Sequence, residues 1–146
     1  MNTNPTPRGL RNNNPLNIRR SKMTSWQGQV ISLNGHTDSA FCQFRTLAYG
    51  YRAAIKLLYN YQRYYRCNSI HTIISRWAPP TENNTEGYIS SVEKRSGVGR
   101  NKVLTADSGS DYRKIVAAMS HCENGIPAVM ADLEAGFRLQ TKIKNR

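Results

Sequence analysis

Carboxylates are the groups with which this chain can carry out acid–base chemistry, and it has few of them. Its 146 residues include nine Asp and Glu, against 21 Lys and Arg. Several of the acids have an ordinary structural explanation: Asp111 suits the positive end of a helix, and Glu86 suits a capping box that begins at Asn83. Three acids lack such an explanation, and they form the candidate catalytic set: Glu123, Asp38 and Glu82.

Glu123 is the candidate for a general acid. It falls in the last turn of an expected helix and follows an apolar stripe that contains Ile115 and Met119. The negative end of the helix dipole and an apolar cleft both disfavour the charged form of a carboxyl group. A glutamic acid in such a place keeps its proton and can donate it to a substrate. The alternative is a surface residue that precedes the Asn124-Gly125 turn.

The other two acids have less defined roles. Asp38 is the only acid among the first 66 residues, and it is either a second catalytic carboxylate or a turn residue. Glu82 follows Pro79 and Pro80 in a rigid loop, where it can hold a sugar or a water, or cap the next helix. The sequence leaves these alternatives open.

Amide side chains gather in the stretch RNNNPLNIRR, residues 11–20. Asn and Pro disfavour regular structure, so the stretch is either an unstructured leader or a loop whose amides have a task. Because an amide both donates and accepts, an ordered loop beside a cleft can bind the N-acetyl and hydroxyl groups of a glycan. The alternative is a structural loop whose amides bind its own backbone. The candidate substrate-binding residues are Asn13, Asn14, Asn17, Asn83 and Asn84, with Trp26, Trp77 and Tyr88 as flat apolar faces for sugar rings.

The hydrophobic pattern predicts a mainly helical single domain, residues 1–146, with one small β-hairpin. Residues 1–25 lack periodicity and are expected to be irregular. The hairpin is expected over 28–44, around the Asn34-Gly35 pair. About five helices are expected: 47–66, a second after a Ser69 cap and ended by Pro79, 84–96, a fourth from Ser110 to Gly125, and a last one with Pro127 in its first turn.

Net charge and cysteine content limit the classes of partner and cofactor. A net charge of +12 and a pI of about 10.1 imply a polyanionic partner: nucleic acid, an anionic membrane or an anionic cell wall. No apolar run is long enough to span a membrane, and the N-terminus lacks the pattern of a secretory signal. The three Cys and three His lack metal-ligand spacing, so no metal or other cofactor is expected. A Cys peptidase that uses Cys122 and a distant His71 stays as an alternative.

Longer segments resemble known families. The segments RGLRNNNPLNIRR, FCQF, YGYRAAIKLLYNYQ and IISRWAPPTENNTEGYISSV, with the W-x-G at Trp26, resemble a group of phage and prophage proteins. Proteins of that group are often described as virion structural proteins, and their fold looks lysozyme-like. A second resemblance is to cell-wall glucosaminidases of the lysozyme superfamily, in which a helix-ending Glu precedes an Asn-Asn loop, a W-x-G and an F-x-x-F pair. In this sequence that Glu, Glu123, comes last, as in a circular permutation.

The residues and the resemblances together predict a peptidoglycan hydrolase. It would cleave the β-1,4 glycan backbone as a muramidase, glucosaminidase or lytic transglycosylase, with Glu123 as the acid. The alternative is a non-catalytic virion structural or wall-binding protein with the same lysozyme-like fold. Glycan strands and other virion proteins are the expected partners. A nucleic-acid-binding module is disfavoured, because an Asn-rich loop and a helix-ending Glu have no role there. The protein would be made in the cytoplasm as a phage or prophage product and act at the bacterial cell wall.

Overall fold

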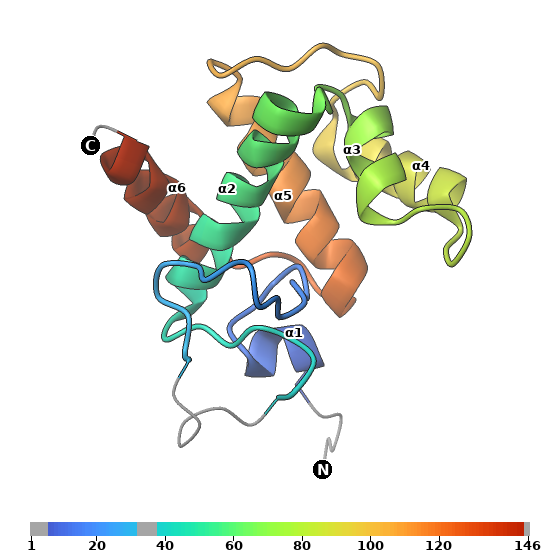
Figure 1. Ribbon diagram of the computed structural model, residues 1–146. Coiled ribbons are helices and arrows are strands. Elements are labelled where there is room, and N and C mark those ends of the chain that lie inside the picture. The colour runs from blue at the N-terminus through green and yellow to red at the C-terminus, as the bar shows by residue number, and fades with distance from the viewer. Residues whose placement is uncertain (1–5, 32–37, 145–146) are drawn as a thin grey trace.

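The computed structural model describes residues 6–31 and 38–144, the side chains up to residue 141, and is mainly helical (Figure 1). A short helix precedes five longer ones, and these five are the helices that the periodicity predicts. The helices are α1 (Arg8–Arg11), α2 (Leu47–Tyr65), α3 (Ile70–Trp77), α4 (Thr85–Ser96), α5 (Gly109–Asn124) and α6 (Met130–Lys144). None of the helices in these ranges is long and apolar enough to cross a membrane.

Side chains cap the N-termini of α2, α3 and α4, whereas α5 begins at Gly109 rather than at the predicted Ser110 and has no side-chain cap bond. Ser69 caps α3 as predicted, in a reciprocal capping box with Thr72. The cap of α4 is Asn84 rather than Asn83: the Asn84 side chain accepts a hydrogen bond from the backbone of Gly87. Pro127 lies before α6 rather than in its first turn, because that helix begins at Met130.

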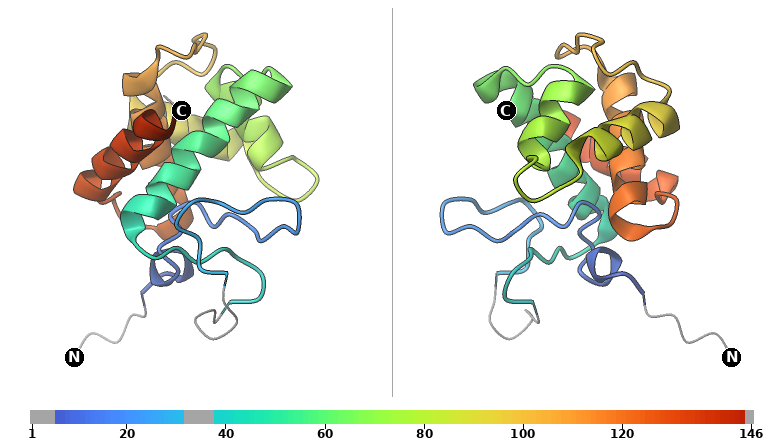
Figure 2. Two further views of the ribbon diagram at one scale, coloured as in Figure 1. Left: turned by 60° about the vertical axis from the view of Figure 1, so that its left-hand side comes forward. Right: turned by 90° about the vertical axis from the view of Figure 1, so that its right-hand side faces the viewer.

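Helices α2 and α5 cross at the centre of the molecule, and the other helices pack on them (Figures 1 and 2). Helix α6 lies along α2, α4 packs on α5, and α3 packs on α4 and on α2. Gly136 permits the close approach of α6, since a Cβ there would lie 2.6 Å from the Ala48 oxygen and from the Arg52 nitrogen of α2. Apolar side chains from α2, α3 and α5 form most of the core, which includes Ile55, Ile74 and Ile115.

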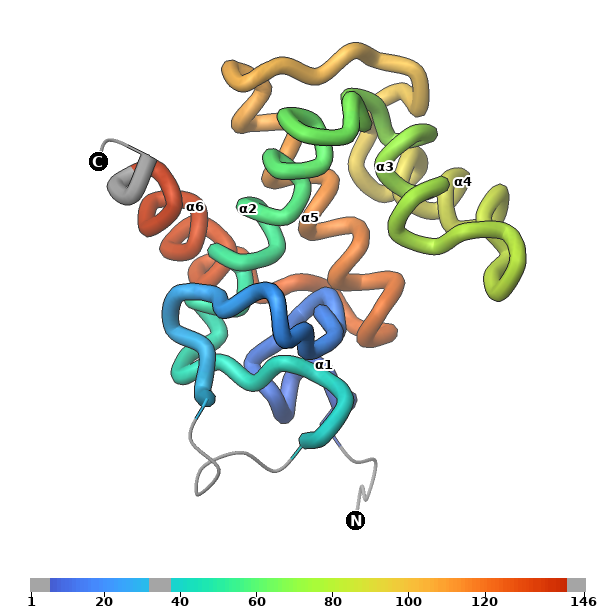
Figure 3. The backbone as a smooth tube through the Cα atoms, in the orientation of Figure 1, coloured from blue at the N-terminus to red at the C-terminus, as the bar shows by residue number. Residues whose placement is uncertain are grey.

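The chain before α2 lies beneath the ends of α2 and α5 and has little regular structure (Figure 3). Its first part was expected to be wholly irregular, but it contains the single turn of α1. In the described parts of 28–44, the expected hairpin is reduced to isolated antiparallel bridges, such as Gln29 with Phe44, and no continuous strand forms. The predicted turn at Asn34-Gly35 lies outside the described residues. A β-hairpin is therefore not shown.

Candidate functional site

A cavity of about 400 Å³ opens beside the C-terminal end of α5. The end of α5, the 78–83 loop between α3 and α4, and the irregular N-terminal segment contribute its walls. Its volume falls in the range of about 300–1,000 Å³ that is typical of small-ligand sites. The lining residues are Asn17, Arg19, Phe41, Tyr61, Trp77, Ala78, Pro79, Glu82, Asn83, Tyr88 and Glu123.

Glu123 is the most strongly hydrogen-bonded side chain of this cavity. The amide nitrogen of Asn17 donates to Oε1 at 3.1 Å. The Tyr88 hydroxyl donates to Oε2 at 2.8 Å, and the Trp77 indole nitrogen lies 3.4 Å from the same oxygen. The three donors come from the N-terminal segment, α4 and α3. Residues up to 106 positions apart therefore hold the carboxyl group in one orientation.

Tyr88 is well suited to remain a hydrogen-bond donor in this group. Burial and the neighbouring Glu123 carboxylate raise the pKa of Tyr88 far above its usual range. Its hydroxyl therefore stays neutral at all working pH values and keeps its proton for Glu123.

The end of α5 is fixed to the N-terminal segment by its last residue. Asn124 is buried, and its amide nitrogen donates to the backbone oxygens of Pro15 and Ser120, both at 2.9 Å. Gly125 then ends the helix in the left-handed conformation, with φ of 74°. Gly9 allows this close contact, since a Cβ there would lie 2.6 Å from the Asn124 amide oxygen and 2.9 Å from that of Asn17.

Within the amide-rich stretch, the asparagines have different tasks. Asn14 is fully buried; its nitrogen donates to the backbone oxygens of Ile18 and Cys42, and its oxygen accepts from the Ile18 nitrogen. Asn13 donates to the backbone oxygen of Phe44. Asn13 and Asn17 adopt φ of 53° and 54°, a left-handed conformation that Asn tolerates better than most residues. Asn13 and Asn14 thus bind the backbone of their own segment, and Asn17 alone of these three lines the cavity.

Asp38 lies in a different environment from Glu123. Arg8 binds its carboxylate through two hydrogen bonds, of 2.7 and 2.8 Å, and the buried amide of Asn12 adds a third. The backbone nitrogens of Ala40 and Phe41 donate to it as well. These partners, Arg8 above all, hold the pKa of Asp38 far below its usual range. Asp38 does not line the cavity, and its contacts give it a structural task; a catalytic role for it stays a prediction.

The remaining predicted binding residues divide between the cavity and its surroundings. Glu82 and Asn83 line the cavity, together with Trp77 and Tyr88. Asn84 caps α4 and lines an adjoining open hollow. Trp26 packs, partly buried, against the core.

Sequence reasoning did not assign Arg19, Phe41 or Tyr61 to the site. The guanidinium of Arg19 lies 5.0 Å from the centre of the Phe41 ring, and the two residues come from segments joined by an isolated bridge. Tyr61 belongs to the predicted helix 47–66, and nothing in its spacing distinguishes it from a core residue. The contacts that bring these residues to the cavity join distant parts of the sequence. Residue spacing alone therefore could not assign them to the site.

Metal and thiol chemistry find little support in the described residues. No group of three or more His, Cys, Asp and Glu within 6–31 and 38–144 is placed to hold a metal ion. The three cysteines are free, and burial raises the pKa of the Cys122 thiol. A raised pKa opposes the thiolate form that a cysteine nucleophile needs.

Comparison with known proteins gives the chain its family. No family model matches it. It is, however, 38% identical over 138 residues to Protein P5 of Pseudoalteromonas phage PM2, an alignment that covers 92% of this chain and 82% of Protein P5. The chain therefore belongs to a family of phage proteins that includes Protein P5. The name of that relative states no activity.

Proposed function

We propose that the protein cleaves the β-1,4-linked glycan backbone of peptidoglycan, with Glu123 as the general acid. The observation that carries the proposal is the anchoring of Glu123 at the cavity by Asn17, Trp77 and Tyr88. A carboxyl group held by partners from three segments keeps the orientation that proton transfer to a bound substrate requires.

The lining of the cavity suits a sugar chain. Trp77, Tyr61 and Phe41 supply aromatic surface for the apolar faces of sugar rings. The amides of Asn17 and Asn83 can donate to and accept from hydroxyl and N-acetyl groups. A net charge of +12 attracts an anionic wall and raises the rate of encounter at low salt.

In the proposed reaction Glu123 gives its proton to the glycosidic oxygen, and the bond from that oxygen to the anomeric carbon breaks. Positive charge then develops on the anomeric carbon and the ring oxygen. Glu82 is the other acid that lines the cavity within the described ranges, and we assign it the stabilisation of this charge or the positioning of a water. The oxygen of that water bonds to the anomeric carbon, and its proton goes to Glu82 or to the carboxylate that Glu123 has become. In a second route, the substrate's own N-acetyl oxygen or C6 hydroxyl attacks the anomeric carbon in place of water. This route needs no second carboxylate. With the C6 hydroxyl as nucleophile, the Glu123 carboxylate takes up its proton and the product has an anhydro end.

Digestion of purified peptidoglycan by the wild type and by Glu123→Gln tests this proposal. The wild type should release muropeptides with reducing or anhydro ends, identified by mass spectrometry, and Glu123→Gln should lower the rate by about 10²–10⁴-fold. Glu134→Gln is the matched control, since Glu134 pairs with Arg113 and does not line the cavity. Equal activity of Glu123→Gln and the control would contradict the assignment of the acid.

A second candidate function is that of a non-catalytic phage virion protein that uses the same cavity to bind the cell wall. The relationship to Protein P5 favours it, because that protein belongs to a phage and its name carries no enzymatic term. This function predicts that the wild type binds peptidoglycan but releases no soluble product from any wall type. Copurification with phage particles would support it directly.

A further inference from the structure

The C-terminal end of α2 carries an exposed group of aromatic and cationic side chains. The rings of Tyr61 and Tyr65, one helical turn apart, meet edge to face with their centroids 6.3 Å apart. Arg76 of α3 stacks on Tyr65, with its guanidinium carbon 3.5 Å from that ring centroid and 5.3 Å from the centroid of Tyr61. We call Tyr61, Tyr65 and Arg76 the Tyr–Arg cluster.

This cluster adjoins the cavity that holds Glu123. Tyr61 belongs to both, because its side chain also lines the cavity. Arg76 directly precedes Trp77, whose indole nitrogen lies 3.4 Å from the Glu123 carboxylate. A polymer that occupies the cavity can therefore continue onto Tyr65, whose side chain is 54% exposed.

The cluster carries the positive charge of Arg76 and lies in a basic part of the chain. Between Asp38 and Glu82 the sequence contains six Lys and Arg and no acid. The ion pairs found among the described residues do not involve Arg76. Exposed Arg63 and Arg66 add positive charge at the same end of α2. Stacking uses the face of a guanidinium and leaves N–H groups at its edge to donate to an anion.

A ligand that fits this cluster combines an apolar ring face with a carboxylate. Tyr61 and Tyr65 provide the aromatic surface, and Arg76 provides a donor pair that matches carboxylate geometry. Peptidoglycan has this combination, because every second sugar of its glycan strands carries a peptide stem with free carboxylates. Single-stranded nucleic acid also combines stacking with negative charge, but it offers nothing for the anchored Glu123 to act on.

We propose that the Tyr–Arg cluster binds a stem-peptide carboxylate of the glycan strand that lies in the cavity, so that the protein prefers peptide-bearing glycan to bare glycan. This inference rests on the proposed binding of peptidoglycan at the Glu123 cavity. It adds a specificity that Glu123 and its three partners do not themselves provide.

Binding measured in the Glu123→Gln background tests the inference without digestion of the substrate. Two probes are compared: intact peptidoglycan, and, as the bare glycan, a chitin oligosaccharide, which is a β-1,4-linked chain of N-acetylglucosamine with neither stem peptides nor carboxylates. Arg76→Gln is expected to weaken binding to the peptide-bearing glycan about tenfold and binding to the bare glycan less than twofold, since a hydrogen bond to a charged group is lost only in the first case. Arg138→Gln on α6, an exposed Arg of equal charge, is the matched control and should change neither affinity by more than about twofold.

Each outcome separates the inference from the proposed function. If the wild type digests peptidoglycan and Arg76→Gln binds both probes as the control does, the inference is wrong and the proposed function stands. If the wild type digests nothing but Arg76→Gln loses the peptide-bearing glycan selectively, the binding site is supported and the enzyme is not. Tighter binding of a single-stranded oligonucleotide than of peptidoglycan, lost in Arg76→Gln, would overturn the inference in favour of nucleic acid. Arg76→Lys, which keeps the charge, should recover part of the affinity if folding is intact.

Discussion

Glu123 is held from two sides, and the two sides are built differently. On one side the N-terminal segment, residues 12–18, has almost no regular structure, and buried amides hydrogen-bond its backbone in place of a helix or sheet. We call it the amide wall. On the other side the regular helices α3 and α4, which pack on each other, present Trp77 and Tyr88, and α4 also packs on α5. We call this the helical wall.

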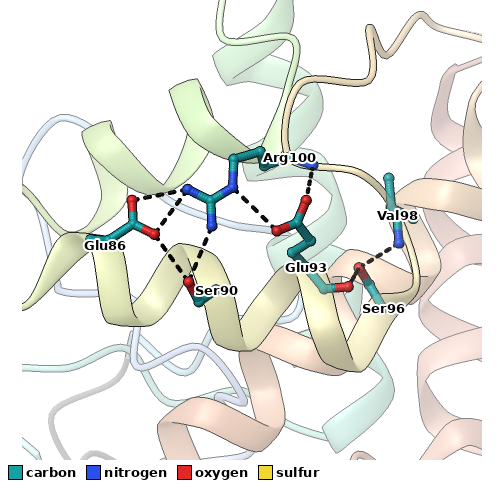
Figure 4. Close-up of polar contacts among 6 residues, drawn as sticks. All are labelled: Glu86, Ser90, Glu93, Ser96, Val98 and Arg100. Carbon is teal, nitrogen blue, oxygen red and sulfur yellow. Dashed lines mark hydrogen bonds and ion pairs between the residues drawn. The ribbon is translucent and has the colours of Figure 1, made fainter.

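The helical wall is further secured at its outer edge by ion pairs. Arg100, in the loop after α4, lies between Glu86 and Glu93 and also donates to Ser90 (Figure 4). The backbone nitrogen of Arg100 donates to Glu93 as well, at 2.8 Å. The irregular amide wall depends on a few buried polar contacts, whereas the packed helices of the helical wall spread their stability over many apolar contacts. Substitutions in the amide wall should therefore lower the free energy of unfolding more than substitutions in the helical wall.

The largest effect is expected from Asn14→Ala in the amide wall. This change removes three hydrogen bonds in a fully buried place; the Cys42 oxygen and the Ile18 nitrogen lose their Asn14 partner, while the Ile18 oxygen still accepts from the Cys42 nitrogen. We expect a loss of about 3 kcal/mol in the free energy of unfolding, measured by urea denaturation. Asn83→Ala, in the loop that joins the two helices of the helical wall, is the control: its amide is exposed and donates one hydrogen bond, to the Pro79 oxygen. That control should lose less than about 0.5 kcal/mol, and equal losses would contradict the comparison.

The second-largest effect is expected from Asp38→Asn, because the Asp38 carboxylate accepts hydrogen bonds both from Arg8 and from Asn12 of the amide wall. The loss of charge-assisted hydrogen bonds should cost about 2 kcal/mol at neutral pH. Folding lowers the pKa of Asp38, so the native state binds fewer protons there than the unfolded chain. Its contribution is therefore complete above the pKa of an unfolded Asp, about 4, and is lost as the pH falls below it.

Urea denaturation at several pH values between 7 and 2.5 measures this dependence. The wild type should lose stability steeply below about pH 4, and Asp38→Asn should lose less over the same interval. Parallel curves for the two proteins would show that Asp38 does not carry the acid sensitivity.

The smallest effect is expected from Arg100→Gln at the edge of the helical wall. Arg100 lowers the pKa of both Glu86 and Glu93, but all three side chains are partly or largely exposed to solvent. The melting temperature should fall slightly at pH 7, by less than in Asn14→Ala, and the difference should vanish as the pH falls through the lowered pKa values. Lys94→Gln, which removes a nearby exposed charge, is the control for net charge.

The helical wall was predictable from the sequence, and the amide wall was predictable only in part. The period of Ile70, Ile73 and Ile74, with the Ser69 cap, gave α3 to within a few residues, because helix signals are local. Whether an Asn faces a ligand or a backbone group depends on neighbours that are distant in sequence. Asn14 binds Cys42, which lies 28 residues away, so its task could not be read from RNNNPLNIRR.

The candidate site shows the same limit. Glu123, Asn17, Trp77 and Tyr88 were selected for their chemistry, and the fold brings them together. Their hydrogen bonds form because α3, α4 and α5 come together with the N-terminal segment. Residue spacing in the sequence does not predict that arrangement. Asp38, the lone acid of a basic segment, pairs with Arg8, a partner 30 positions away that the sequence did not indicate; its catalytic role stays a prediction.

The bonds from Asn17 to Glu123 and from Asn124 to Pro15 join residues 106 and 109 positions apart. During synthesis the amide wall leaves the ribosome long before the end of α5 exists. The Glu123 cavity therefore cannot form until residues 123 and 124 have been made. Contacts of such long range also form slowly during folding. In a cell that makes this protein, the assembled site therefore exists only after residue 124 of each chain has left the ribosome.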